Sequence, residues 1–533
     1  MKKLYSLYAI VLLLFISSTV GIADIQKNTQ NNMNIPSDEW TMTYGGLLED
    51  GAEYVQPTND NGYIITGYTY SYSNGESDLW LIKTDSEGNM IWNKSFGGSS
   101  WDHGFSVRQT IDNGYIIVGY TLSYGAGDED VWLIKTDSSG NKIWDKTFGG
   151  SGFDEGREIQ VTKEGGYIII GTTKSYGSGD NDFWLIKTDS YGNKLWNKTF
   201  GGDYDDYGYS VHQTSSGGYI LTGYTTSKGA GSGDVWLVRT DVNGKKLWDK
   251  TFGGNGWDRG RSVRQTTDGG YIIAGSTFSY GVGGDIWILK TDISGTLEWQ
   301  MNRGQLGEDR GRSVRQTSDQ GYIITGFRYS ATQQSNDLWL IKLDKDGNRH
   351  WNTTISGDDW DRGICVEQTS DNGFIIAGYT KSYGEGDRNA WLVKTAPGNN
   401  PPYKPSKPGG QVNGEPGETY RYTTNTSDFD GDDIYYLFDW GDGTDTGWLG
   451  PYISGETARI SHEWVEKGNY NIKVKAKDDP NGDGNLSDGE ESIWSEPLSI
   501  SMPKTKIIQT PFLDFLENHP HLFPFLRQIL LVL

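Results

Sequence analysis

The chain alternates short runs of apolar, β-branched and aromatic residues with clusters of Asp, Asn, Ser and Gly, as the stretch from Phe105 to Gly150 illustrates. Four such runs are present there, at residues 105–110, 115–121, 130–137 and 142–148. None has the 3.6-residue period of a helix, so the stretch predicts a four-stranded antiparallel sheet. Because the second run is apolar at nearly every position, we expect burial on both faces, as in a sheet stacked between two others.

The same four-run pattern recurs along the chain with a nearly constant period. Its clearest marker is a tryptophan in the third run, and successive copies are 52 residues apart except for one step of 51. These tryptophans are Trp80, Trp132, Trp184, Trp236, Trp287, Trp339 and Trp391. A second tryptophan marks the fourth run, at Trp40, Trp92, Trp144, Trp196, Trp248, Trp299 and Trp351. A fixed period of this length indicates a repeat architecture.

The order of the runs distinguishes an open solenoid from a closed propeller, the two architectures that stack sheets. The first three runs occur seven times each between Ala52 and Lys394. The fourth also occurs seven times, but its first copy, at residues 40–46, precedes all the others, and the last repeat lacks one. An N-terminal strand that completes the seventh sheet would close the ring and remove exposed strand edges. We therefore predict an all-β protein with a seven-bladed β-propeller over residues 38–396, closed by its N-terminal strand.

The N-terminus has the pattern of a secretory signal peptide. Two lysines precede an apolar run at residues 9–16, and small residues follow at Gly21 and Ala23. This pattern predicts a signal peptide over residues 1–23 and a protein that is secreted or at the cell surface. The alternative is an uncleaved N-terminal membrane anchor.

Charge and cysteine content narrow the classes of partner. The formal net charge of −23 argues against nucleic acid and anionic membranes as partners. Cys365 is the only cysteine, so no disulfide can form within the chain. It stands where other repeats have serine, and we predict a small buried residue there.

Beyond the repeats the composition changes. Residues 397–410 are rich in proline and predict a stiff linker. Residues 411–502 contain short alternating strands and turns, which are typical of a β-sandwich. Residues 503–533 form an apolar tail interrupted by Pro520 and Pro524. The N-terminal segment and this tail are the candidates for attachment to a membrane or envelope.

Within the predicted sandwich, the sequence Phe438-Asp-Trp-Gly-Asp-Gly-Thr444, followed by His462-Glu-Trp464 and Gly468-Asn-Tyr470, resembles the PKD family of Ig-like extracellular modules. The whole chain, including its tail, also resembles archaeal cell-surface proteins that combine such repeats with a PKD domain. The resemblance implies a surface or secreted protein and names no reaction.

Two long loops in each repeat predict a recognition face. The loop between the second and third runs and the connection to the next repeat fall on one face, because the strands are antiparallel. Aromatic rings in these loops suit a protein or glycan, since they stack on sugars and side chains. The candidate residues are Tyr124, Tyr176, Tyr280, Tyr383, Trp101, Trp257 and Trp360. The alternative is structural: the rings would fill joints between sheets, and neighbouring aspartates would cap turn N–H groups.

Arginines gather in the later repeats and break the regular pattern. They are Arg259, Arg261, Arg264, Arg310, Arg312, Arg315 and Arg362. They predict either a cationic rim for an acidic glycan or pairing with neighbouring aspartates.

The loop from Asp479 to Glu490 matches the calcium-binding pattern D-x-[DN]-x-[DN]-G-x₅-E. Its candidate ligands are Asp479, Asn481, Asp483, Asn485, Ser487 and Glu490. Because the flanking segments are predicted strands, the Ca²⁺ site would be structural. The alternative is an acidic surface loop that binds no metal. No other cofactor is predicted.

Sequence motifs for catalysis are lacking. His103 and His212 lie in different repeats, without a neighbouring nucleophile motif. We therefore predict a non-enzymatic extracellular protein whose propeller face recognises a protein or glycan, with the PKD-like module as a spacer or adhesion domain. The alternatives are a purely structural envelope component and an extracellular enzyme, polysaccharide-cleaving or quinoprotein-like, with its site at the centre of the ring. An enzyme should show a polar cluster near the channel that occurs in a single copy.

Overall fold

The computed structural model describes residues 38–331, 333–396, 401–428, 430–480, 482, 484, 486 and 489–502. These residues form strands and turns and no helix, so none of them forms a helix that could cross a membrane. The chain divides into two compact units, Met1–Gly398 and Asn399–Leu533, which are described separately. The predicted signal peptide (1–23) and apolar tail (503–533) lie outside the described residues.

The N-terminal unit contains seven four-stranded antiparallel sheets, and six of them consist of four consecutive strands. The first two are β2 (Asp50–Pro57), β3 (Tyr63–Thr69), β4 (Asp78–Thr84) and β5 (Met90–Phe96), then β6 (Asp102–Gln109), β7 (Tyr115–Thr121), β8 (Asp130–Thr136) and β9 (Lys142–Phe148). The third and fourth are β10 (Asp154–Val161), β11 (Tyr167–Thr173), β12 (Asp182–Thr188) and β13 (Lys194–Phe200), then β14 (Asp206–Gln213), β15 (Tyr219–Thr225), β16 (Asp234–Thr240) and β17 (Lys246–Phe252). The fifth and sixth are β18 (Asp258–Gln265), β19 (Tyr271–Thr277), β20 (Asp285–Thr291) and β21 (Leu297–Arg303), then β22 (Arg310–Gln316), β23 (Tyr322–Ser330), β24 (Ser335–Leu343) and β25 (Arg349–Ile355).

The seventh sheet joins the two ends of the unit. Its strands are β26 (Asp361–Gln368), β27 (Phe374–Thr380), β28 (Asn389–Thr395) and, beside β28, the N-terminal strand β1 (Asp38–Tyr44). The strands β1 and β28 are antiparallel, with Trp40 opposite Lys394 and Tyr44 opposite Ala390. The predicted addition of the N-terminal strand to the last sheet is therefore confirmed.

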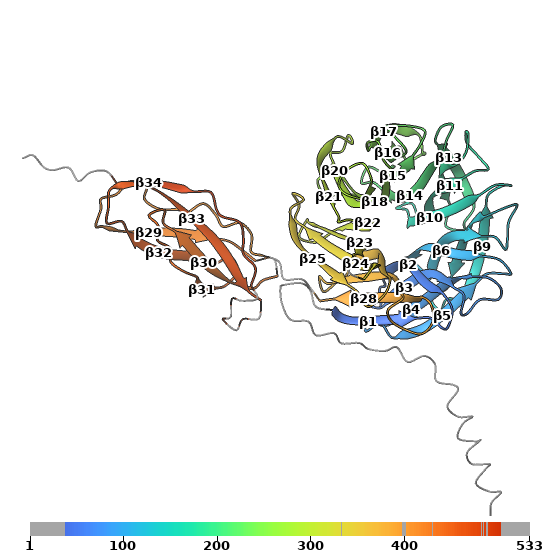
Figure 1. Ribbon diagram of the computed structural model, residues 1–533, viewed down its shortest axis with the longest axis horizontal. Coiled ribbons are helices and arrows are strands. Elements are labelled where there is room, and N and C mark those ends of the chain that lie inside the picture. The colour runs from blue at the N-terminus through green and yellow to red at the C-terminus, as the bar shows by residue number, and fades with distance from the viewer. Residues whose placement is uncertain are drawn as a thin grey trace, which may run out of the picture. The chain divides into compact units, whose positions relative to one another are not determined.

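Each sheet packs against the next one along the chain, and the seventh sheet packs against the first. Contacts between first strands follow the same order, from β2 to β6 and onward to β26, which again touches β2. Figure 1 shows the sheets of this unit around a common centre, with their first strands nearest to it. None of the sheets closes on itself.

Burial explains the apolar runs. Every residue of β8 is buried, because both faces of this strand pack against neighbouring sheets. One core cluster joins Ile116 and Val118 of the second sheet to Ile169 and Trp184 of the third. The third-run tryptophans are almost fully buried, and the indole N–H groups of five of them donate to the fourth strand, as from Trp184 to Asn197 Oδ1 at 3.2 Å. The repeating tryptophans therefore stabilise the joints between sheets.

The C-terminal unit is a sandwich of two antiparallel sheets. One sheet contains β29 (Thr419–Asn425) and β32 (Thr457–Glu463), and the other has the order β31 (Leu449–Tyr452), β30 (Asp433–Asp439), β33 (Gly468–Asp479) and β34 (Leu498–Met502). A single core is shared by the two sheets, with Tyr422 and Ala458 from one and Phe438 and Val474 from the other.

Part of the proline-rich segment that predicts a linker is packed onto this sandwich. The backbone N–H groups of Tyr403, Ser406 and Gly409 donate hydrogen bonds to the carbonyl groups of Ser427, Asn425 and Thr423. Because prolines break regular strands but leave the intervening N–H groups free to pair, residues 403–409 lie along β29 as an irregular edge.

Candidate functional site

A bulge in the first strand of every sheet presents extra side chains to the centre of the N-terminal unit. In β10 the register shifts between Gly156 and Glu158, and the equivalent shift occurs in the first strand of each of the other six sheets. A bulge places two residues opposite one on the partner strand. As a result, Arg157 and Glu158 both line the central cavity although they are adjacent in sequence.

The centre-facing positions also differ among the repeats. The second and third strands are nearly identical among sheets, as Tyr115–Thr121 and Tyr63–Thr69 illustrate. The residues before and after the bulge, by contrast, change from sheet to sheet. They are the pairs Glu53/Tyr54, Phe105/Ser106, Arg157/Glu158, Tyr209/Ser210, Arg261/Ser262, Arg312/Ser313 and Ile364/Cys365. A third variable position, two residues further on, contains Gln56, Arg108, Gln160, His212, Arg264, Arg315 and Glu367.

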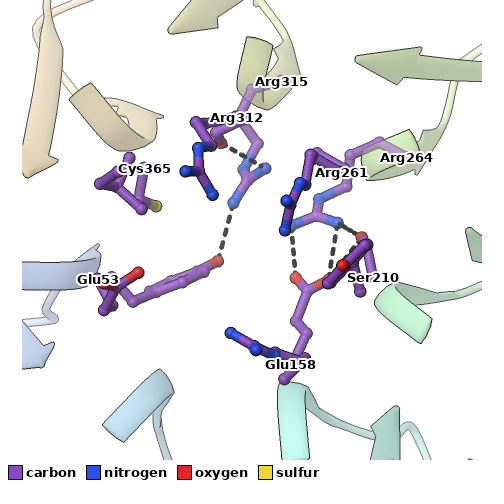
Figure 2. A pocket seen from close by; sticks show the side chains of 14 residues that line it. Glu53, Glu158, Ser210, Arg261, Arg264, Arg312, Arg315 and Cys365 are labelled. Carbon is purple, nitrogen blue, oxygen red and sulfur yellow. Dashed lines mark hydrogen bonds and ion pairs between the residues drawn. The ribbon is translucent and has the colours of Figure 1, made fainter. Parts of the chain in front are cut away.

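These side chains surround two cavities. The first, of about 90 Å³, is lined by the residues at the bulges of six sheets, and the second, of about 330 Å³, by residues further along the first strands. Glu158, Arg264 and Arg315 line both cavities. Figure 2 shows the side chains that reach the first cavity from different strands.

Glu158 is the hub of a buried ion-pair network. Its carboxylate lies 2.7 Å from Arg264 Nη2 and 3.1 Å from Arg108 Nη2, and it accepts a hydrogen bond from Ser210 Oγ at 2.6 Å. Burial raises the pKa of Glu158, but the guanidinium groups of Arg264 and Arg108 outweigh that effect and bring the pKa to about 2. The carboxylate is therefore ionised at any physiological pH.

A second ion pair faces this network. Arg315 binds Glu367 through two parallel hydrogen bonds, with Nη2 at 2.6 Å from Oε1 and Nε at 2.9 Å from Oε2. Arg315 Nη2 also donates to the Tyr54 hydroxyl at 2.8 Å, and that hydroxyl donates to Glu367 Oε1 at 3.1 Å. Burial raises the pKa of Tyr54, so its hydroxyl stays protonated. This bidentate geometry fixes the orientation of both charged groups.

Arg261 and Arg312 also line the first cavity, but they lack the acid partners that Arg264 and Arg315 have. No described residue forms an ion pair or hydrogen bond with the guanidinium group of Arg261 or Arg312, and Arg312 Nε is buried without a partner. Arg261 lies over the ring of Tyr209, 4.0 Å from the ring centroid. Burial lowers the pKa of Arg312 to about 9, with a contribution from the charge of Arg261. Burial raises the pKa of Glu53, which lines the same cavity, although nearby guanidinium groups including that of Arg312 oppose the shift.

The arginines of the later repeats that form ion pairs do so with glutamates, and not with the neighbouring aspartates. The sequence pattern left pairing with neighbouring aspartates as one option, but Arg264 and Arg315 pair with glutamates of other sheets and Arg310 pairs with Glu308. Neighbouring aspartates are occupied in turns instead. Asp258, for example, accepts from Gly254 N at 2.9 Å and from Ser279 Oγ at 2.5 Å, as the structural alternative predicts.

Buried aspartates also meet in pairs between successive sheets. Asp78 Oδ1 is buried without a hydrogen-bond partner, and burial together with the charge of Asp102 raises the pKa of Asp78 to about 6. The same cause raises the pKa of Asp182 and of Asp337 to about 6. The equivalent pairs are Asp130/Asp154, Asp182/Asp206, Asp234/Asp258, Asp285/Asp309 and Asp337/Asp361. At the seventh joint Asn389 takes the place of the first aspartate.

The predicted recognition face lies at the end of the sheets where each first strand begins. Trp101, Trp257 and Trp360 are 40–45% exposed there. Tyr124 is 46% exposed, but its hydroxyl donates to Gly97 O of the preceding connection at 2.8 Å, and its ring lies 5.4 Å from that of Trp132. The hydroxyls of Tyr176, Tyr280 and Tyr383 bind Gly149 O, Gly253 O and Ser356 O in the same way. Each tyrosine thus joins two sheets with its hydroxyl, and Tyr383 is less exposed than the other three.

The two histidines singled out in the sequence are packed within the unit. His103 Nε2 lies 2.7 Å from Ser77 Oγ, its ring stacks on Tyr68, and burial lowers its pKa to about 4. His212 lines the second cavity, and burial lowers its pKa to about 3. Both imidazoles are therefore neutral at pH 7. Cys365 is buried, as predicted, and burial raises its pKa to about 11.

The predicted calcium loop is described only in part. Asp479 is buried and accepts from Gly484 N at 2.8 Å, and Glu490 is half-buried. The other candidate ligands, Asn481, Asp483, Asn485 and Ser487, lie outside the described residues.

A second acidic group lies in the same unit, and the sequence analysis did not single it out. Ligand atoms of Asp428, Asp430 and Asp432 lie within 4.8 Å of one another. The charges of Asp430 and Asp479 add to the effect of burial and raise the pKa of Asp432, so Asp479 adjoins this cluster. Carboxylate oxygens at this separation can bind a hard cation such as Ca²⁺. The repeated spacing in Asp428-Phe-Asp430-Gly-Asp432 was the signal in the sequence.

Comparisons with known proteins identify the C-terminal unit. This unit is an antiparallel β-sandwich, and residues 408–485 match the family described as PKD domain. They include residues that the sequence analysis assigned to a linker. A solved structure titled "PKD domain of M14-like peptidase from Thermoplasmatales archaeon SCGC AB-540-F20" is 44% identical; the match covers 20% of this chain and 99% of that one, with a TM-score of 0.17. The chain carries a PKD domain and belongs, through it, to the PKD-domain family.

A second solved structure matches a larger share of the chain at much lower identity. This structure, titled "Crystal structure of the eukaryotic initiation factor", covers 60% of this chain and 79% of its own, but identity is 9% and the TM-score is 0.30, too low to support an argument. No curated protein matches the chain. PKD domains are typical of extracellular or cell-surface proteins, which is the class that this domain indicates.

Sequence reasoning missed several residues of the central cavity. It singled out Arg261, Arg264, Arg312 and Arg315 but assigned no role to the acids and arginines that face them. These are Glu53, Arg108, Arg157, Glu158 and Glu367. Comparing each repeat with the others position by position would have found them, since they occur where a single repeat departs from the rest.

Proposed function

We propose that this protein is an extracellular or cell-surface recognition protein of the archaeal type that combines propeller repeats with a PKD domain. Its N-terminal unit is a seven-bladed β-propeller whose centre and surrounding face bind a protein or glycan. The PKD domain is a spacer or adhesion module, and one of the terminal segments attaches the protein to a membrane or envelope.

One observation carries the recognition role: nearly identical repeats differ at the positions that line the central cavity. Residues that pair strands or fill joints between sheets recur because every joint has the same geometry. The side chains at the centre are free of that constraint, and a symmetric fold does not require a different residue from each repeat. The second cavity, of about 330 Å³, has the size of a small-molecule site, and the first, of about 90 Å³, has room for one group of a ligand.

Three observations support the propeller assignment. The unit has seven four-stranded sheets, contacts between them return from the seventh to the first, and β1 completes the seventh. Closure of this kind protects strand edges, which an extracellular protein without disulfides needs. The signal-peptide pattern and the PKD domain support export.

The test is a glycan array and a pull-down from cell envelopes, with the chain lacking residues 1–23. Tyr176→Ala removes a ring from the predicted face, and Tyr176→Phe removes only the hydrogen bond to Gly149. Tyr191→Ala is the matched control, because Tyr191 is 72% exposed in the turn at the opposite end of the same sheet. If the predicted face recognises a protein or glycan, binding should be lost with Tyr176→Ala and kept with Tyr176→Phe and Tyr191→Ala. If the wild-type chain binds nothing in either assay, a structural envelope component becomes the better proposal.

An enzyme is the second candidate, because the polar cluster at the centre occurs in a single copy. Glu53 faces the first cavity, and a carboxyl group whose pKa is raised by burial can act as a proton donor. The test is release of reducing ends from a panel of polysaccharides. Turnover that Glu53→Gln abolishes would favour a polysaccharide-cleaving enzyme, and absence of cleavage by the wild type favours recognition.

A further inference from the structure

We infer that the first central cavity contains a carboxylate-binding subsite formed by Arg261 and Arg312, with Glu53 beside it. The inference deepens the proposed recognition function and rests on it. The ligand is a small molecule or chain end that carries one carboxylate group.

Arg261 and Arg312 differ from the other arginines near the cavity because they have no acid partner among the described residues. Arg108 and Arg264 share Glu158, Arg315 binds Glu367, and Arg157 pairs with Glu155 at 2.6 Å. Arg261 and Arg312 line the same cavity, and no described residue forms an ion pair or hydrogen bond with either guanidinium group. Their N–H donors are therefore available to a ligand in the cavity.

Both guanidinium groups lie near aromatic rings. That of Arg261 lies 4.0 Å from the centroid of Tyr209, and that of Arg312 lies 5.8 Å from the centroid of Phe327, a ring that Arg362 approaches more closely. A ring face attracts the cation but accepts none of its in-plane hydrogen bonds. The contact between Arg261 and Tyr209 therefore leaves the donors of Arg261 unused. Figure 2 shows Arg261, Arg312 and Glu53 around the same cavity.

The charges favour an anionic ligand. Two buried positive groups without partners are unfavourable, and a ligand of opposite charge compensates them. Burial raises the pKa of Glu53, and Arg108 and Arg264 share the single carboxylate of Glu158, so the residues around the cavity have an excess of positive charge. A carboxylate provides a negative charge, and its planar pair of oxygens matches the guanidinium fork.

The cavity volume limits the rest of the ligand. About 90 Å³ accommodates the carboxylate group and the atoms next to it, at the end of a sugar or a peptide, and excludes a folded protein surface. An acidic sugar and a peptide C-terminus share the carboxylate, so the experiment has to distinguish these two sources.

The experiment is titration calorimetry at low ionic strength with the chain lacking residues 1–23. The probes are sodium glucuronate, glucose, an N-acetylated dipeptide with a free C-terminus, its amidated form and inorganic sulfate. The variants are Arg261→Gln and Arg312→Gln. Arg310→Gln is the matched control, because Arg310 is on the same strand as Arg312 but pairs with Glu308 and does not line the cavity. Circular dichroism verifies that each variant is folded.

The inference predicts that a carboxylate probe binds and its uncharged counterpart does not. Affinity should fall about tenfold or more in both cavity variants and stay within about twofold in Arg310→Gln. Binding of glucuronate alone identifies an acidic sugar, and binding of the dipeptide alone identifies a chain end. Binding of sulfate only, of no carboxylate probe, or with equal affinity in the variants would overturn the inference. If the glycan array still shows a neutral glycan that requires Tyr176, the recognition function stands and only the subsite is refuted.

Discussion

Trp40 and Lys394 lie opposite each other in adjacent antiparallel strands, although six complete sheets separate them along the chain. The Lys394 ammonium group also lies 3.1 Å from Glu39 and 2.8 Å from Asp371. Backbone pairing and charge therefore hold the N-terminal strand against the end of the same unit. Stability of the whole N-terminal unit should depend on these few residues.

Deletion of β1, residues 38–44, should lower the melting temperature by about 10 °C or more. The deletion exposes the edge of β28 and removes the buried side chains of Met42 and Tyr44. Differential scanning calorimetry measures the effect. Ile111→Ser is the control, because Ile111 is fully exposed in the turn between β6 and β7, and it should leave the melting temperature within about 2 °C. An unchanged melting curve after loss of β1 would contradict closure of the unit by this strand.

The aspartate pairs between sheets predict an unusual dependence of stability on pH. The pKa of Asp78, Asp182 and Asp337 is about 6 in the folded protein and lower in the unfolded chain. At these aspartates the folded state therefore holds more protons between pH 4 and pH 6, and their contribution to the free energy of unfolding should rise as the pH falls from 7 to about 4.5. His103 and His212, whose pKa values burial lowers, contribute in the opposite direction over this range. Below pH 4 protonation of carboxylates with a lowered pKa, such as Glu158, reverses the trend.

A natural amide in the seventh joint provides the control for this prediction. Because Asn389 occupies the position of Asp78 without charge, Asp78→Asn, Asp182→Asn and Asp337→Asn should be tolerated. The triple variant should melt at a higher temperature than the wild type at pH 7 and gain less on acidification. Melting temperatures between pH 3 and pH 8 test both statements, and equal pH profiles for the two proteins would show that the pairs carry no raised pKa.

Removal of Glu158 should destabilise the N-terminal unit strongly. Glu158→Ala leaves the guanidinium groups of Arg264 and Arg108 buried without their acid partner, at a cost of about 3–5 kcal/mol. Urea unfolding measures the change. The control is Asp346→Ala, since Asp346 and its partner Lys345 are both well exposed and such pairs contribute about 0–1 kcal/mol. Equal effects of the two substitutions would mean that the central network does not stabilise the fold.

The strands were the most predictable part of the structure. The predicted run at residues 115–121 is β7 to the residue, and residues 142–148 are β9, because alternating apolar runs and turn residues recur with a fixed period. The first strand was predicted to begin at Phe105 but begins at Asp102, since the bulge between Gly104 and Ser106 interrupts the alternation. Because a bulge interrupts the alternation of apolar and polar residues, periodicity could not predict where this strand begins.

The central cavity was less predictable because its contacts join distant repeats. Arg264 and Glu158 are neighbours in space but belong to the fifth and third sheets, and no spacing rule relates them. Periodicity identifies what every repeat shares, whereas a site at the centre consists of what each repeat does not share. The recognition-face prediction for Tyr124 and its equivalents remains a prediction, to which the structure adds a hydrogen bond between sheets.

Replacing Arg312 and replacing Arg315, which lie on the same strand, should change the stability of the N-terminal unit in opposite directions. Arg312→Met removes a buried charge that has no acid partner and should stabilise the unit by about 1 kcal/mol or more. Arg315→Met, three residues along the strand, leaves Glu367 without its bidentate partner and should destabilise it by about 3 kcal/mol. Urea unfolding of both variants is the measurement. Destabilisation by Arg312→Met comparable to that by Arg315→Met would indicate that Arg312 serves the fold and not a ligand.

Asp479 links two candidate calcium sites in the PKD domain, and substitutions can separate them. It begins the predicted loop that ends at Glu490, and its charge raises the pKa of Asp432 in the second acidic cluster. Asp479→Asn should therefore weaken Ca²⁺ binding at either site. Glu490→Gln should weaken binding only if the loop is the site, and Asp428→Asn only if the cluster is.

Calorimetric titration with CaCl₂ at pH 7.5 and pH 5 should distinguish these cases. If the cluster binds the ion, affinity should fall about tenfold or more at pH 5, because burial raises the pKa of Asp428 to about 6 and Ca²⁺ must displace its proton. Glu463→Gln is the control, since Glu463 is exposed on β32 and should leave the affinity unchanged. Loss of binding with Glu490→Gln alone would assign the ion to the predicted loop. Absence of binding heat for the wild type at both pH values would show that these carboxylates form a solvated acidic surface, as the alternative interpretation of the sequence holds.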